Sequence, residues 1–224
     1  MKVLLFGATG MVGQGVLREC LLDRSVTEVK AVGRTPVPAP QPPNAKFSQL
    51  LHKDLFDLGA VENQITGYDA CFFCLGVSMV GLSEPEYRRL TYDLTLSVAR
   101  TLARLNPQMT FVYVSGAGTD STAKSSTLWA RVKGETENAL LTLPFRAAYM
   151  FRPGFIQPMH GITSKTKLYR SLYVVLAPLY PLLKRVAPKY VSTTEQVGRA
   201  MIEVAERGAR QPIIENTDIN ALQR

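Results

Sequence analysis

The sequence contains few of the residues that most often bind metals or form disulfides, with two histidines and three cysteines among 224 residues. Cys20, Cys71 and Cys74 cannot all pair, and Cys71-x-x-Cys74 lies in an apolar run that predicts a buried strand. The CxxC spacing is compatible with a redox pair or half of a zinc site, but there is no second CxxC pair. The composition therefore favours buried structural thiols and no metal site.

Acidic residues are absent from residues 138–194, whereas eight basic residues lie there. Elsewhere, 18 of the 26 basic residues match the 18 acidic residues, so the net charge of +8 comes from this span. The excess predicts an anionic ligand, partner or surface near this part of the chain. No nucleic-acid-binding motif accompanies it, and we expect no nucleic-acid partner. The basic residues of the span are Arg146, Arg152, Lys165, Lys167, Arg170, Lys184, Arg185 and Lys189.

Long hydrophobic runs are also absent. The uncharged stretch of residues 171–183, SLYVVLAPLYPLL, has thirteen residues and contains Pro178 and Pro181, so it is too short and too interrupted for a spanning helix. Two interpretations remain, a lid or homodimer contact and a segment that lies on an anionic membrane surface. We favour the first, because exposed apolar patches more often meet protein.

The N-terminal residues lack the pattern of a secretory signal. Met1-Lys2 runs directly into the apolar residues 3–6 and then a glycine turn, without a charged region, an apolar core and a cleavage site. On this basis we expect a cytoplasmic protein.

Short apolar runs of strand length alternate with segments of helix length. This alternation predicts an α/β fold of the Rossmann type, a doubly wound parallel sheet with helices on both faces. We expect one domain over residues 1–224, with 155–195 as a small, variable C-terminal substrate or lid segment. The expected strands are residues 3–6, 29–32, 47–51, 70–75, 110–115 and 146–151. A helix is expected over residues 83–105, with Ser83 as its N-cap.

The first expected strand runs into Gly7-x-x-Gly10-x-x-Gly13 and then an amphipathic helix. This order brings a tight turn, a close backbone approach and the positive end of a helix to one place, which suits a pyrophosphate. The alternative is a plain strand-to-helix turn, and the position of the motif favours phosphate binding. The expected contacts at this turn are Gly7, Thr9, Gly10, Met11, Val12 and Gly13.

The end of the second expected strand favours NADP over NAD. An NAD site usually has an acidic residue there for the ribose 2′-hydroxyl, whereas this chain has Gly33-Arg34-Thr35. A guanidinium at this point suits a 2′-phosphate, although a solvated loop arginine is the alternative. Further cofactor contacts are expected after the third and fourth strands, from Asp54, Leu55, Leu75 and Gly76.

The chain resembles the atypical short-chain dehydrogenase/reductases. The motifs are GATGxxG, VGR, FVYVSGAG, VKGETE and FRPG, in this order over nearly the whole chain. The similarity is greatest to the Tat-interacting-protein-like and NmrA-like branch and to bacterial NAD-dependent epimerase/dehydratase-like proteins. It implies a Rossmann fold and a bound dinucleotide, and it places Arg152, Pro153 and Gly154 beside the nicotinamide end of the cofactor.

In active members of that group, a Tyr-x-x-x-Lys pair transfers the proton and holds the nicotinamide ribose. Here Lys133 has the lysine position, but Trp129 replaces the tyrosine, and an indole has no usable acid–base equilibrium near neutral pH. The substrate-orienting serine corresponds to Ser115 only at the strand end, since Gly116 and Ala117 follow. Ser115 either orients a ligand or caps the strand.

Two functions follow from this site. One is an NADP-dependent oxidoreductase or epimerase-like enzyme acting on a small apolar or anionic molecule, with Lys133 and an unidentified proton donor. The other is a catalytically silent NADP-binding redox sensor that acts through a protein or membrane partner.

Overall fold

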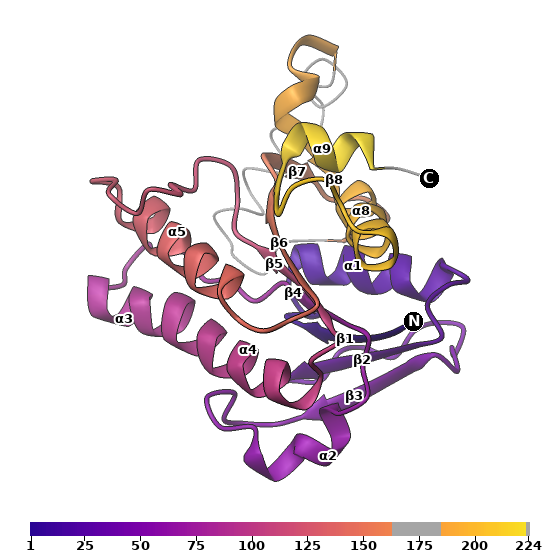
Figure 1. The fold of residues 1–224 in the computed structure, drawn as a ribbon. Coiled ribbons are helices and arrows are strands. Elements are labelled where there is room, and N and C mark those ends of the chain that lie inside the picture. The colour runs from indigo at the N-terminus through magenta and orange to yellow at the C-terminus, as the bar shows by residue number, and fades with distance from the viewer. Residues whose placement is uncertain (163–184, 223–224) are drawn as a thin grey trace.

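The computed structural model describes residues 1–162 and 185–222. Within these ranges, seven parallel strands form one sheet in the order β3-β2-β1-β4-β5-β6-β9 (Figure 1). The sheet confirms the predicted Rossmann-type α/β fold. Its strands are Lys2–Phe6 (β1), Glu28–Gly33 (β2), Phe47–Leu51 (β3), Ala70–Phe73 (β4), Thr110–Val114 (β5), Ala147–Arg152 (β6) and Ile213–Glu215 (β9).

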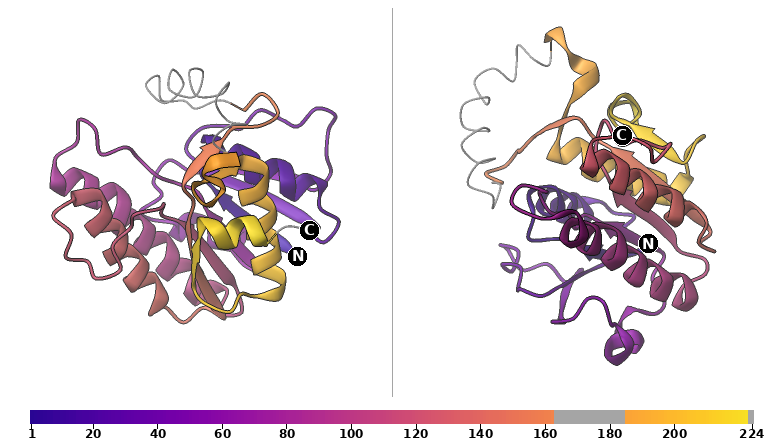
Figure 2. Two further views of the ribbon diagram at one scale, coloured as in Figure 1. Left: turned by 90° about the horizontal axis from the view of Figure 1, so that it is seen from above. Right: turned by 90° about the vertical axis from the view of Figure 1, so that its left-hand side faces the viewer.

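Helices cover both faces of the sheet. Helices α1 (Met11–Leu22) and α8 (Thr194–Arg207) lie together on one face (Figures 1 and 2). The other face carries α3 (Glu84–Arg88), α4 (Leu94–Leu105) and α5 (Leu128–Leu141). Two shorter helices are α2 (Glu62–Ile65) and α9 (Asn216–Ala221). Among the helices that the structure describes, none combines the length and the apolar character needed to cross a membrane.

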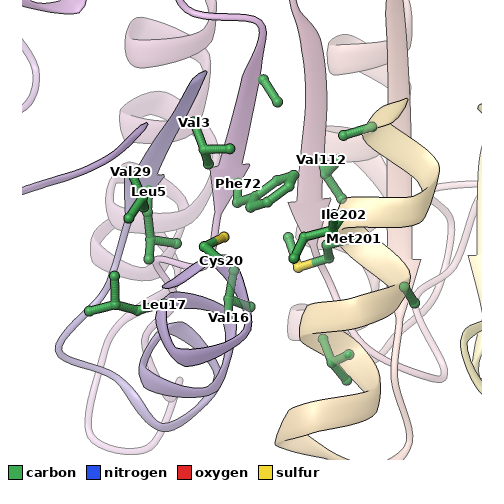
Figure 3. Packing of buried hydrophobic residues seen from close by; sticks show 14 of the residues in the cluster. Val3, Leu5, Val16, Leu17, Cys20, Val29, Phe72, Val112, Met201 and Ile202 are labelled. Atoms are coloured by element: carbon green, nitrogen blue, oxygen red, sulfur yellow. The ribbon is translucent and has the colours of Figure 1, made fainter. Parts of the chain in front are cut away.

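Each face of the sheet has its own hydrophobic core. On the first face, side chains of β1, β2, β4 and β5 pack against α1 and α8, as the labelled residues Val3, Phe72, Val16 and Met201 illustrate (Figure 3). Side chains that point to the opposite face pack against α2, α4 and α5. Because both of their faces are buried, the central strands β1, β4 and β5 are almost continuously apolar, which explains why they could be recognised from sequence.

The predicted helix over 83–105 is present but interrupted. Ser83 and Glu86 bond to each other at its start, as the pattern predicted, with Ser83 N–H donating to Glu86 Oε2 at 2.9 Å. Between α3 and α4, residues Arg89–Asp93 form a π-helical turn. Such a turn inserts one residue into the helical repeat, and apolar spacing alone does not reveal it.

The chain after β6 adds elements that the strand pattern did not predict. Strand β7 (Phe155–Gln157) pairs with β8 (Val191–Thr193) in a small parallel sheet outside the main one. Each of these strands, like β9, has three residues, which is too short for a periodic signal. The run of residues 171–183, with its lid, dimer and membrane interpretations, lies outside the described residues.

Among the described basic residues of the span 138–194, Arg146 and Arg152 have side-chain partners within the protein. Arg146 donates to Thr110 Oγ1 at 2.7 Å and to the carbonyl oxygen of Ala205 at 3.1 Å. The guanidinium of Arg152 is buried between two carboxylates. The charge of Arg152 is thus neutralised inside the protein, whereas Arg146 remains exposed and contributes to the surface charge.

The cysteines are not joined by disulfides, and Cys20 and Cys71 are fully buried, as predicted. Burial raises the pKa of all three thiols, which keeps them protonated and unreactive.

Helices α1 and α8 approach closely because Gly15 has no side chain. A Cβ on Gly15 would lie 2.5 Å from Cβ and 2.8 Å from the carbonyl oxygen of Thr194. We expect Gly15→Ala to lower the free energy of unfolding by about 1–3 kcal/mol, because overpacking outweighs the better helix propensity of alanine. Gly33→Ala is the matched control, since its Cβ would meet only Thr35 O at 3.9 Å. Urea unfolding measures the stability of both variants. A Gly15→Ala protein as stable as the Gly33→Ala protein would contradict the tight contact between α1 and α8.

Candidate cofactor site

Parallel strands end at the same edge of a sheet, so the turns after β1, β2, β4, β5 and β6 lie along one edge. The site residues expected from the sequence end or follow these strands or β3, or lie in the first two turns of α1 and α5. The order of the strands places the glycine turn after β1 at the centre of this edge. In this fold, the centre of the edge is where ligands bind.

The glycine turn is held by contacts that a side chain would prevent. Gly7 has a φ of +83°, and a Cβ there would lie 2.6 Å from the carbonyl carbon of Cys74. A Cβ on Gly13 would lie 2.1 Å from Gly7 O. Gly7 is required for its backbone conformation and for its close approach to Cys74. Gly13 is required because the start of α1 lies close to the carbonyl oxygen of Gly7.

The first turn of α1 points its backbone amides at this same place. Gly10 is the N-cap residue and has no side chain to accept their hydrogen bonds, while its own N–H donates to Gly7 O at 2.9 Å. The amides of Met11, Val12 and Gly13, together with the positive end of the helix dipole, can therefore bind an anion. The turn fits a pyrophosphate.

One cavity adjoins the glycine turn, and a second cavity shares Arg34, Leu55 and Leu75 with it. The first has a volume of about 350 Å³. The second, about 360 Å³, lies between the turn after β3 and the turn after β4. Of the expected cofactor residues, Gly7, Thr9, Arg34, Leu55 and Leu75 line the first cavity, and Arg34, Asp54, Leu55, Leu75 and Gly76 line the second.

The first cavity has a positively charged wall. It is lined by Arg34 and by Thr35, and no carboxylate is among the described residues that line it. The second cavity has one acidic wall residue, Asp54, whose Oδ1 already accepts the Phe56 N–H at 2.9 Å. The sequence prediction did not include Thr35, Val37 and Gln49, which line the first cavity and lie on or beside β2 and β3.

Lys133 lies on α5 and reaches back to the end of β5. Its ammonium group donates to the carbonyl oxygen of Ser115, and its side chain is half-buried. Burial lowers the pKa of Lys133 to about 8, and the carboxylate of Glu137 opposes this shift. The ammonium is thus charged at neutral pH but close to its titration point.

Trp129 lies one turn before Lys133 on the same helix and packs against the loop after β5. Gly118 in that loop has a φ of +86°, and a Cβ there would lie 3.1 Å from the indole ring. The indole is half-buried. The ring thus covers a glycine backbone at the position where a phenol is expected, and it supplies no titratable proton.

The side chain of Ser115 faces the interior. The residue is 3% exposed, and its Oγ lies 2.5 Å from Glu137 Oε1 and 3.1 Å from Phe151 O. A hydroxyl has one proton, and the charged acceptor at the shorter distance takes it. The following residues, Gly116 and Ala117, carry no hydroxyl.

Arg152 ends β6 and forms a buried ionic cluster. Its guanidinium donates through Nε and Nη2 to the carboxylate of Glu137. It also donates to Glu215 Oε1 at 3.1 Å and to Ser121 Oγ at 2.6 Å. The turn that follows is also held, because Gly154 N–H donates to Asn216 Oδ1 at 2.8 Å. Pro153 O accepts the Ala117 N–H at 2.9 Å, which joins this turn to the loop after β5.

The expected residues thus fall into two groups. The glycine turn, Arg34 and the residues after β3 and β4 surround the two cavities, whereas Lys133, Trp129, Ser115 and residues 152–154 gather around the ends of β5 and β6. Glu137, which contacts both Ser115 and Arg152, was not recognised as a site residue. It lies within VKGETE, four residues after Lys133, and this spacing is the signal that could have found it.

A larger cavity, about 770 Å³, lies between α1 and the proline-rich loop of residues 36–43. Its walls are mainly apolar, and it shares Ala8 and Thr9 with the first cavity. Thr9 is the one expected site residue that lines it. It therefore adjoins the glycine turn without belonging to the predicted site.

The parallel sheet, the glycine turn and the adjoining cavities define a nicotinamide-dinucleotide-binding protein of the Rossmann type. Comparison with known proteins agrees with this class. The chain belongs to the NAD(P)H-binding family, whose model matches residues 7–141.

Two relatives place the chain in the atypical short-chain dehydrogenase/reductase branch. The mitochondrial protein fmp52 of Emericella nidulans is 32% identical over 159 residues, which are 69% of this chain and 66% of that protein. HTATIP2 of Rattus norvegicus is 29% identical over 155 residues, 69% of this chain and 62% of that protein. The chain therefore spans slightly less than two thirds of the length of these relatives.

A solved structure shows the same fold. A short-chain dehydrogenase family protein from Francisella tularensis superposes with a TM-score of 0.66 at 14% identity, covering 97% of this chain and 98% of that protein. At this identity the likeness concerns the fold alone.

The expectation of a cytoplasmic protein is contradicted by the comparisons. The fmp52 relatives from several fungi are named mitochondrial. The expectation was based on the lack of a secretory pattern, and that pattern does not distinguish between compartments inside the cell.

The position of Lys133 predicts an amine that titrates near neutral pH. Acetylation by acetic anhydride at a series of pH values, followed by peptide mass spectrometry, should give a Lys133 midpoint near pH 8 instead of the usual 10.5. Because the folded chain releases this proton before the unfolded chain does, the contribution of Lys133 to stability rises with pH across that interval. Free Nα-acetyl-lysine is the reference amine, and a Lys133 midpoint equal to that of the reference would contradict the burial of its ammonium.

Proposed function

We propose that this chain is an NADP(H)-binding protein that holds the dinucleotide in a reductase-type cleft but lacks the standard proton donor. The observation that carries the proposal is the position of Arg34, which directly follows β2 and lines both cavities, the first of which is also lined by Gly7 and Thr9 of the glycine turn. The cofactor, when bound, would supply or accept a hydride at its nicotinamide ring.

The preference for NADP over NAD rests on charge. The side chain of Arg34 is exposed, and no carboxylate of the described residues lies within ion-pair distance of it. A guanidinium with unused donors binds a 2′-phosphate through charge-assisted hydrogen bonds. The 2′-hydroxyl of NAD would lack its usual carboxylate acceptor in the 350 Å³ cavity.

The remaining residues divide the binding of the dinucleotide between them. The amides of Met11, Val12 and Gly13 would receive the pyrophosphate, and Asp54, Leu55, Leu75 and Gly76 would border the adenosine half. The Lys133 ammonium would donate to the nicotinamide ribose, with residues 152–154 beside it. Ribose binding needs only the charge and the donors of the lysine, so this role does not depend on a neighbouring tyrosine.

The same site argues against ordinary carbonyl reduction. Trp129 cannot release a proton, and the Ser115 hydroxyl is directed at Glu137 inside the protein. Neither of the two groups that polarise a carbonyl in active members is then available at its usual position. We therefore favour a protein that binds the dinucleotide and reports on it through a partner.

One observation favours a second candidate, an oxidoreductase in which Lys133 itself gives the proton. Its pKa of about 8 makes the ammonium a competent general acid near neutral pH. The substrate in that case would be a small molecule that enters beside Trp129. Activity that survives every change at Trp129 but is lost in Lys133→Met would favour this candidate.

Cofactor choice gives a direct prediction. NADPH should bind on the order of 10- to 100-fold more tightly than NADH, because a charge-assisted contact to Arg34 is present for NADPH alone. Arg34→Ala should reduce the affinity for NADPH to that for NADH and leave NADH binding unchanged. Calorimetric titration of both cofactors measures this.

The matched control is Arg100→Ala on the exposed side of α4, which should keep the NADPH preference. Equal affinities of the wild-type protein for NADPH and NADH would contradict the assignment of Arg34.

Restoring the phenol tests the missing proton donor. With NADPH and a panel of aldehydes and ketones, the wild-type protein should show no turnover above background, whereas Trp129→Tyr should show detectable reduction. General acid catalysis typically contributes about 10²–10⁴-fold, which sets the scale of the gain. Trp129→Phe is the control, since it has a similar ring without the hydroxyl. Robust reduction by the wild-type protein would show that another group supplies the proton, and the silent binder would have to be abandoned.

A further inference from the structure

We propose that Glu137 is the positioning residue of the candidate site, because its buried carboxylate joins α5, which carries Lys133, to two neighbouring chain segments. These segments are the start of the loop after β5, where the Ser115 carbonyl oxygen receives the Lys133 ammonium, and the end of β6 at Arg152. The proposal rests on the proposed function in one respect, namely that Lys133 contacts the cofactor.

Glu137 lies one helical turn after Lys133, so both side chains project from the same face of α5. The residue is 1% exposed, and both of its carboxylate oxygens are used. Oε1 accepts from Ser115 Oγ at 2.5 Å and from Arg152 Nε at 3.0 Å, and Oε2 accepts from the Arg152 Nη2 group. A carboxylate this far from solvent is stable only because these donors surround it.

Glu137 holds the residue that accepts the hydrogen bond from Lys133, which is Ser115. The carbonyl oxygen of Ser115 receives the Lys133 ammonium, while the hydroxyl of the same residue is held by Glu137. Ser115 thus links the Glu137 carboxylate to the carbonyl oxygen that receives the ammonium, and its own N–H donates to Phe151 O at 2.9 Å. Without the Glu137 carboxylate, the hydroxyl loses its charged acceptor and can turn its proton to Phe151 O at 3.1 Å.

The bond to Arg152 fixes the facing turn. Arg152 precedes Pro153, whose carbonyl oxygen accepts the Ala117 N–H at 2.9 Å. The guanidinium also donates to Ser121 Oγ at 2.6 Å, in the loop that leads to α5. One carboxylate thus ties together all the backbone that borders Lys133.

Glu137 has charged and titratable neighbours on β5 and β6, and a carboxylate at the end of β9 shares its partner Arg152. Glu137 is negative, and the Arg152 guanidinium on β6 is balanced by Glu137 and by Glu215 at the end of β9. Tyr113 on β5 stays neutral over the range tested, because burial raises its pKa, and its neighbour Tyr87 lies on α3. The carboxylate of Glu137, although it also pairs with Arg152, raises the pKa of Lys133 against the effect of burial.

The experiment compares Glu137→Gln with Glu215→Gln. Both variants remove one carboxylate partner of Arg152, but Glu215 contacts neither Ser115 nor Lys133 in the contacts of the described residues, and its side chain is 47% exposed. In the cofactor-free protein, acetylation of Lys133 should have its midpoint about one pH unit lower in Glu137→Gln and unchanged in Glu215→Gln. NADPH binding should be roughly tenfold weaker in Glu137→Gln alone.

Circular dichroism verifies that each variant is folded. A folded Glu137→Gln protein with the wild-type Lys133 midpoint would overturn the proposal, and so would an equal shift in Glu215→Gln. If Glu137→Gln does not fold, Ser115→Ala decides, since it removes only the hydroxyl link. The Ser115→Ala protein should bind NADPH about threefold more weakly, and the pH dependence of Lys133 acetylation should change. Unchanged affinity together with an unchanged profile would overturn the proposal.

The result can be separated from the proposed function. The acetylation profiles need no cofactor, so they report on Glu137 and Lys133 alone. Protection of Lys133 from acetylation by NADPH in the wild-type protein reports on the cofactor role. If NADPH fails to protect Lys133 while Glu137→Gln still lowers its acetylation midpoint, the proposed cofactor contact is rejected and the positioning role of Glu137 is retained.

Discussion

The site depends on the close contact between the backbones of Gly7 and Cys74. Because a Cβ at Gly7 would lie 2.6 Å from Cys74, β1 can turn sharply into α1 while β4 ends beside it. That turn fixes where the amides of α1 point and where the cavities bordered by Arg34 open. The contact of Gly15 with Thr194 then holds the same helix against α8. Close backbone packing, made possible by glycine, thus builds the cofactor cleft.

The second half of the site is organised by charge. A buried carboxylate on α5, satisfied by a serine and an arginine, holds the ends of β5 and β6 around a lysine. The arrangement preserves what a dinucleotide needs, a cation and fixed backbone, while the hydroxyls that transfer a proton are replaced or turned inward. Loss of a proton donor need not disturb cofactor binding, since the two depend on different side chains.

The sequence predicted the parallel sheet and the glycine turn because buried parallel strands are almost uniformly apolar and the turn requires glycine at fixed positions. It did not predict β7, β8 and β9, which have three residues each, or the π-helical turn at Arg89–Asp93, which leaves no trace in apolar spacing. Lys133 and Trp129 could be placed by their spacing on one helix. Glu137 shares this spacing, four residues after Lys133, but its contacts could not be predicted, because its partners Ser115 and Arg152 are 22 and 15 residues away and meet it only in the folded chain.

A crystal structure of the full chain with NADPH would test the central claim most directly, since it shows both halves of the site at once. The 2′-phosphate should lie against the Arg34 guanidinium, and the nicotinamide ribose should accept a hydrogen bond from Lys133, with the indole of Trp129 facing the nicotinamide end. A 2′-phosphate directed into solvent, or a ribose with no contact to Lys133, would contradict an intact cofactor half.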